Sequence, residues 1–79
     1  MKLIRMIDNY INDREFSMIY KNNKLDIINY HEIVDFSSER ISIRYNNFIY
    51  YVNGTNLVVS KMIEDEILIT GNIISINFI

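Results

Sequence analysis

This chain lacks several residue types, and each absence excludes a class of site. Its 79 residues include no cysteine, so neither a disulfide framework nor a thiolate metal site is available. The one histidine, His31, cannot form a histidine-rich metal site. The only glycines, Gly54 and Gly71, lie in separate segments, which excludes a glycine-rich phosphate loop. We therefore predict a protein that is not an enzyme, with no catalytic residue, metal, cofactor or small-molecule substrate.

Charge and hydrophobic runs are equally limited. The formal net charge is −2 and the eight basic residues are scattered, which leaves no basic patch for nucleic acid. Arg5 and Asp8 interrupt the N-terminal apolar run, so a signal peptide is not expected. Residues 45–60 are uncharged but contain four Asn and a Gly, which excludes a transmembrane helix. We expect a cytoplasmic protein, soluble or peripheral to a membrane.

Apolar residues at every second position predict strands. A hydrophobic content of 49% excludes a disordered chain, and the alternating residues are mostly Ile, Val, Tyr and Phe, which pack well on pleated surfaces. The expected core face consists of Ile41, Ile43, Phe48, Tyr50, Val52, Ile67, Ile69, Ile74, Ile76 and Phe78. The sequence thus predicts an all-β fold, a small antiparallel sheet, sandwich or stacked meander of about six to seven short strands.

Short polar breaks between these segments predict tight turns. They are Asn22-Asn23, Ser37-Ser38, Asn46-Asn47, Asn53-Gly54, Glu64-Asp65 and Gly71-Asn72. Asn53-Gly54 is the strongest signal, because both residues tolerate the positive φ of a two-residue type I′ hairpin. We assign Asn53, Gly54 and Gly71 a structural role in turns.

A shift of 26 residues lays one part of the chain on another. Ile41 falls on Ile67, Ile43 falls on Ile69, and "FSSERISI" aligns with "MIEDEILI". Such self-similarity is typical of repeated supersecondary units. It indicates either a duplicated β unit or coincidental alternation.

The N-terminal residues have another period. Leu3, Ile4, Ile7, Tyr10 and Ile11 fall at helical spacing, and a polar run follows them. We predict a short amphipathic helical segment over residues 1–16, followed by one β domain over residues 17–79. The helix would either cover the sheet or dock on a partner.

The face opposite the expected core also carries apolar residues, namely Ile49, Tyr51, Leu68 and Ile73. A sheet with one solvated face should alternate more strictly. Either this face packs on more of the same chain, or it contacts another molecule, and unpaired sheet edges favour assembly. These four residues form the candidate interaction face.

The segment from Leu25 to Phe78 resembles the YabP/YqfC family of sporulation proteins of Firmicutes. The matching signals are Asn29-Tyr30 before an apolar strand, "FSSERISI", "VNGTNLVV" and the closing "EILITGNIISINF". This sequence departs from the family where Asn29-Tyr30-His31-Glu32 replaces a glycine-containing turn, and where the chain has no proline before the first strand.

The resemblance implies a non-enzymatic protein made in the mother cell, which acts in spore envelope assembly beside a membrane-protein partner. It implies no catalytic residues. Self-association into a homo-oligomer is the other partnership that we expect. The alternative function is a generic ligand- or lipid-binding β module that docks on a membrane through its N-terminal helix.

Overall fold

The computed structural model describes residues 15–79, which form six strands and no helix. The strands are β1 (Ser17–Lys21), β2 (Lys24–Ile28), β3 (Glu32–Phe36), β4 (Arg40–Tyr45), β5 (Phe48–Ile63) and β6 (Glu66–Phe78). The predicted all-β class is confirmed. The helix predicted over residues 1–16 falls on residues 1–14, which lie outside the described residues, and on two following positions that are not helical.

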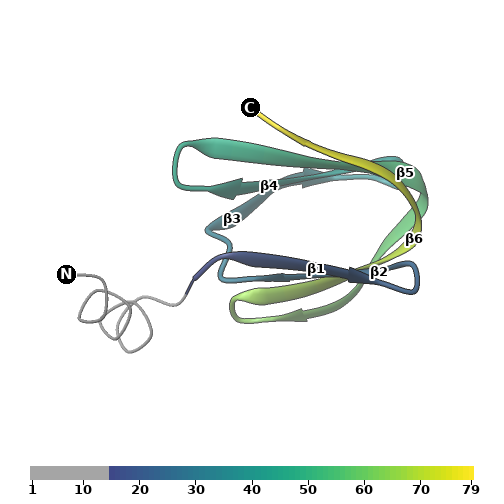
Figure 1. Cartoon of the computed structure of the whole chain (residues 1–79), viewed down its shortest axis with the longest axis horizontal. Helices are drawn as coiled ribbons and strands as arrows, with labels where there is room; N and C mark the ends of the chain where they lie inside the picture. Colours follow the sequence, from purple (N-terminus) through teal and green to yellow (C-terminus); the bar gives the residue numbers. More distant parts are fainter. Residues whose placement is uncertain (1–14) are drawn as a thin grey trace.

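The strands form one antiparallel sheet in the order β1-β2-β6-β5-β4-β3. β5 and β6 are much longer than the others, and they curve together so that the sheet folds over on itself (Figure 1). The first layer contains β3, β4, residues 48–53 of β5 and residues 73–78 of β6. The second layer contains β1, β2, residues 58–63 of β5 and residues 66–70 of β6.

The core lies between these two layers. Its buried side chains are Leu25, Ile27, Ile41, Ile43, Val52, Leu57, Ile67 and Ile69. Five of them were predicted, whereas Leu25, Ile27 and Leu57 were not in the expected core. The buried residues of β2 and β6 cover those of β4 and β5, which removes apolar side chains of both layers from water.

Part of the predicted core is instead exposed. Phe48, Ile74, Ile76 and Phe78 expose 45%, 68%, 39% and 62% of their side-chain surface. The ladder places Phe48, Ile76 and Phe78 on the same face as the core residues of the first layer, as alternation indicated. The prediction was wrong because the second layer covers only part of that face.

Four of the six predicted turns connect strands. Asn22-Asn23 joins β1 to β2 with φ values of 53° and 61°, and Asn46-Asn47 joins β4 to β5 with φ 55° at Asn46. Asn reaches this left-handed region more readily than other non-glycine residues. Ser37-Ser38 and Glu64-Asp65 lie in the other two connections.

The turns predicted at Asn53-Gly54 and Gly71-Asn72 are wrong. Asn53 and Gly54 lie inside β5, and Gly71 lies inside β6. A Cβ on Gly54 would lie 2.1 Å from the carbonyl oxygen of Asn72, and Gly71 has φ +125° with a Cβ position 2.4 Å from the carbonyl oxygen of Asn56. These glycines allow the close backbone approach at which β5 and β6 bend between layers, instead of reversing the chain.

The two segments related by the 26-residue shift form hairpins with the same register. Ile33 pairs with Ile43 and Phe36 with Ile41, while in the shifted hairpin Val59 pairs with Ile69 and Met62 with Ile67. The register shift before Asp35 also recurs at the equivalent place before Lys61. Duplication as the origin of this likeness stays a prediction.

Candidate functional site

Six rings make successive contacts on the first layer, in a curved row whose first and last members both lie near the β4–β5 turn. Its members, called the aromatic row below, are His31, Tyr45, Phe16, Tyr50, Phe78 and Phe48, in the order in which they touch. Centroid separations between successive rings are 4.8, 4.5, 5.0, 5.4 and 5.9 Å. These separations are typical of favourable aromatic contacts, in offset, tilted and edge-to-face arrangements.

Strand register builds this row. Tyr45 pairs with Phe48 next to the β4–β5 turn, and Tyr50 pairs with Phe78 across the β5–β6 ladder. Directly opposite residues share a face and lie close enough for ring contact. Phe16, which precedes β1, stacks on Tyr45 and tilts against Tyr50, so it ties the two layers together.

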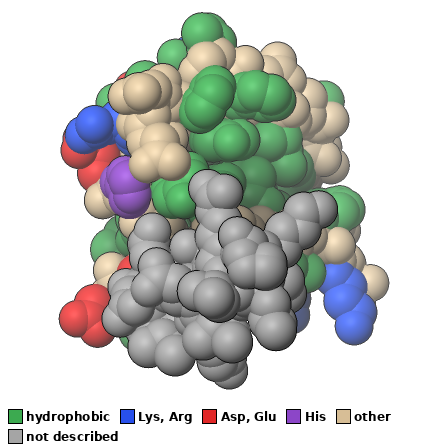
Figure 2. All heavy atoms as spheres, turned by 60° about the vertical axis from the view of Figure 1, so that its left-hand side comes forward, with side chains coloured by type: hydrophobic (Ala, Val, Ile, Leu, Met, Phe, Trp, Pro, Cys, Tyr) green, Lys and Arg blue, Asp and Glu red, His purple; other side chains and the backbone are tan. Residues whose placement is uncertain are grey.

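The aromatic row ends in exposed apolar surface. Phe48 and Phe78 are 45% and 62% exposed, and the neighbouring Ile76 and Ile79 also contact solvent. In Figure 2, hydrophobic side chains gather on one face of the molecule, beside the histidine. A contiguous apolar patch on so small a protein is typical of a surface that contacts another molecule.

The histidine, the first ring of the aromatic row, has a structural contact beside the β4–β5 turn. The backbone N–H of Asn46 donates a hydrogen bond of 3.0 Å to Nδ1 of His31, and the Tyr45 ring packs against the imidazole. His31 is exposed beside the β4–β5 turn. Nearby, Arg44 and Glu32 form an ion pair between β4 and β3.

The predicted interaction face does not form a single surface. Ile49 and Tyr51 lie on the outer face of the first layer, whereas Leu68 lies in the second layer opposite Asp26. Ile73 lies opposite Gly54, where the sheet bends, and it packs against the core, so its predicted placement on the face opposite the core was wrong. All four residues are half-buried, and the Arg40 guanidinium lies 4.8 Å from the centre of the Tyr51 ring. Their role in binding stays a prediction.

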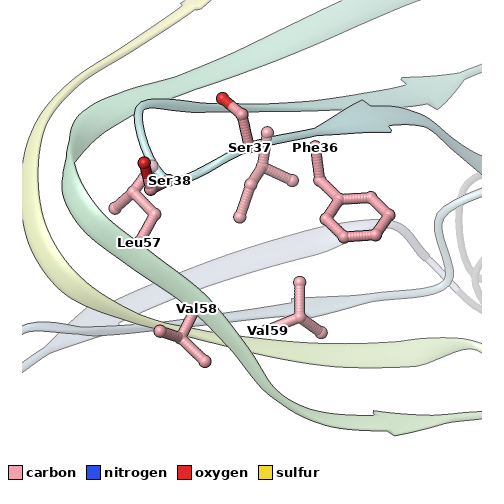
Figure 3. Close-up of a pocket in the computed structure, with 7 residues that line it drawn as sticks. Phe36, Ser37, Ser38, Leu57, Val58 and Val59 are labelled. Carbon is pink, nitrogen blue, oxygen red and sulfur yellow. The ribbon is translucent and has the colours of Figure 1, made fainter.

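A separate pocket of about 400 Å³ lies between the β3–β4 connection and the bent part of β5. Phe36 and Val59 point into the space between the layers from β3 and β5 (Figure 3). Ser37 Oγ accepts hydrogen bonds from the backbone N–H groups of Glu39 and Arg40, so it stabilises the turn. The pocket offers apolar contact and no ionisable side chain.

A carboxyl pair lies on the outer face of the second layer. A hydrogen bond with the side chain of Asp26 raises the pKa of Glu66, and burial and the charge of Asp26 raise it further. Glu66 pairs with Ile28 at the start of β6, and this register brings the two acids to diagonal positions on neighbouring strands. Within residues 15–79, no group of three or more His, Cys, Asp or Glu side chains could hold a metal ion.

The sequence could have indicated the aromatic row only in part. Tyr45, Phe48, Tyr50 and Phe78 alternate correctly, but they were assigned to the core or left unassigned. Phe16 was missed because its contact partners are distant in the sequence. Aromatic residues that cluster near the ends of predicted neighbouring strands were the available signal.

Comparison with known proteins gives one match. The model of the YabP family matches residues 13–79, which includes every strand described above. No curated protein and no solved structure matches the chain. No helix in the described part is long and apolar enough to cross a membrane.

Proposed function

This chain belongs to the YabP family, and on that premise we propose that it is a non-enzymatic assembly component of the spore envelope. Membership indicates a sporulation-related protein. The finer role is an adaptor that works in the cytoplasm of the mother cell, against a membrane protein at the envelope surface. The exposed end of the aromatic row carries this proposal.

The chemistry of this surface favours binding. Phe48 and Phe78 present ring faces and edges without charge, and large aromatic side chains contribute more binding energy than most other residues. The one imidazole of the row holds the β4–β5 turn through Asn46, which is a structural task. The partner that fits this surface is an apolar segment, such as the membrane-proximal part of a membrane protein.

Deletion of the gene in the organism that encodes this chain tests the proposal. We expect fewer heat-resistant spores and a defective envelope by electron microscopy. A wild-type copy should restore both, whereas Phe48→Lys should not, because a charge in the aromatic row must be desolvated when an apolar partner binds.

Val34→Lys is the matched control. Val34 exposes 44% of its surface, against 45% for Phe48, and it lies on β3 outside the aromatic row. This variant should restore sporulation. Normal spores after deletion would contradict the proposed role, and equal rescue by both variants would contradict the role of the aromatic row.

A further inference from the structure

Within residues 15–79, one edge of the first layer has no neighbouring strand. Residues 66–70 of β6 lie between β2 and β5, but among the described residues the following part, residues 72–78, pairs with β5 alone. We call this part the free edge of β6. Its backbone groups on the side away from β5 are available to another strand.

Hydrogen bonding at the end of the ladder shows which groups these are. Ile49 and Ile79 exchange two N–H···O bonds of 3.1 and 3.0 Å. Bonded and non-bonded pairs alternate in an antiparallel ladder, so Tyr51 and Asn77 also bond to each other. The N–H and C=O groups of Ile76 and Phe78 therefore point away from β5.

The free edge of β6 differs from the other sheet edges in charge. β1 ends at Lys21, β3 contains Glu32 and Asp35, and residues 58–63 of β5 contain Lys61. Residues 67–79 contain no charged side chain at all. Charges on edge strands oppose pairing with another strand, so among the sheet edges of the described part of the chain only the free edge of β6 lacks this protection.

We propose that the free edge of β6 pairs antiparallel with the same strand of a second copy. The two-fold axis passes at Asn77, so Ile76 lies opposite Phe78 of the other copy and Asn77 lies opposite its equivalent. This register satisfies the outward N–H and C=O groups of both residues in both copies. It uses residues 75–79, which lie beyond the irregular pairing at Asn53 and Gly54.

Self-pairing suits this edge better than pairing with an unrelated strand. A two-fold interface brings the same strand of both copies together, so a charged side chain near the axis would lie close to its own equivalent, and an uncharged strand avoids this repulsion. The equivalent pairing of β3 would bring acidic side chains of both copies together. The Ile76–Phe78 contact is also a β-branched and aromatic cross-strand pair, which stabilises sheets.

Pairing would join the first layers of two copies into one continuous sheet. Ile76 and Phe78 are 39% and 62% exposed in the single chain, and each would cover the other across the axis. Among residues 15–79 the core has only eight buried apolar side chains, and small domains commonly gain stability by association. This inference goes beyond the proposed function and requires no membrane partner.

Cross-linking at the axis is the direct test. The chain has no cysteine, so Asn77→Cys supplies one exposed thiol, opposite its equivalent in a non-hydrogen-bonded pair. The Cα atoms of such pairs lie about 4.5 Å apart, within the range that a disulfide spans. We expect rapid formation of a covalent dimer under mild oxidation. Asp35→Cys, an exposed position on β3 away from the axis, is the control, and it should form little covalent dimer although it still pairs through β6.

Backbone hydrogen bonding is tested by Phe78→Pro. Proline removes the N–H that points away from β5, so the β5–β6 ladder survives, but two bonds across the axis are lost. We expect roughly thirtyfold weaker dimerisation than in Phe78→Ala, by light scattering over a concentration series, since each bond is worth about 1 kcal/mol. Phe78→Ala has the same loss of the ring but keeps the N–H.

Three results would overturn the pairing. They are a wild-type protein that is monomeric up to its solubility limit, cross-linking of Asn77→Cys no faster than that of Asp35→Cys, and equal masses for Phe78→Pro and Phe78→Ala. None of these three results depends on the outcome of the gene-deletion experiment. Failure of the pairing is therefore distinguishable from failure of the proposed function.

Discussion

The hairpin of β3 and β4 and the hairpin formed by residues 59–71 of β5 and β6 begin alike and end differently. Both have the same register, including the same irregular step. In the first hairpin the chain then reverses at Asn46-Asn47 and returns as β5. At the equivalent place in the second, the chain continues through Asn72 as β6 without reversing.

The neighbour of the middle strand explains this difference. In the first layer, Ile41 and Ile43 pair with Val52 and Tyr50 of the returning strand. In the second layer, the equivalent Ile67 and Ile69 pair with Ile27 and Leu25 of β2. Because β2 occupies the place of a returning strand, the end of β6 continues into the first layer and adds the free edge there.

A substitution at Gly54 should destabilise the place where β5 and β6 pass from one layer to the other. The Cβ of Gly54→Ala would lie 2.1 Å from the Asn72 carbonyl oxygen, and backbone cannot move aside as a side chain can. We expect the free energy of unfolding to fall by about 3 kcal/mol, as for other overpacked sites. Urea denaturation measures this loss.

Thr55→Ala is the control for this change. Thr55 is exposed on the same strand, and its substitution should cost less than about 1 kcal/mol. An equal urea midpoint for Gly54→Ala and the wild type would show that β5 and β6 do not approach as closely as described.

Conservative substitutions at equivalent core positions test whether the two hairpins pack alike. Ile41 and Ile67 expose 1% and 0% of their side chains. Ile41→Val and Ile67→Val should each lower the free energy of unfolding by about 1 kcal/mol, because each removes one buried methylene group. Ile76→Val, at a partly exposed position, should cost less. If Ile41→Val and Ile67→Val lowered the free energy of unfolding by amounts that differ more than twofold, the two hairpins would differ in packing.

The sequence predicted the strands better than their connections. Alternation identified Ile41, Ile43, Ile67 and Ile69 as core because each is covered from the opposite layer, whichever strand supplies the cover. Alternation specifies a face of a strand but not how far the other layer extends. Phe48 and Phe78 are therefore on the expected face and still exposed.

The glycine positions show a second limit. Asn-Gly is a strong local signal for a hairpin turn, yet Gly54 is needed where Asn72 of another strand passes close to its backbone. That requirement comes from a contact between residues distant in the sequence. The aromatic row was missed for the same reason, since Phe16 meets Tyr45 and Tyr50 only after the layers fold together.

The smallest expected effect is a difference between the two hairpins in how their contribution to stability depends on pH. Glu66 and Arg40 occupy equivalent positions, but Asp26 of β2 lies beside Glu66 and raises its pKa above the ordinary value of 4.5. An acid whose pKa is raised on folding favours the folded state while protonated, and this contribution is lost as pH rises through the folded pKa.

Glu66→Gln removes the titrating group, so its stability relative to the wild type should increase as the pH is raised from below 4.5 to neutrality. Urea denaturation at acidic and neutral pH measures the difference. Arg40→Gln is the control, because it removes a group that does not titrate in this range. If the difference between Glu66→Gln and the wild type stayed constant with pH, Asp26 would not perturb Glu66, and the two hairpins would differ in strand order alone.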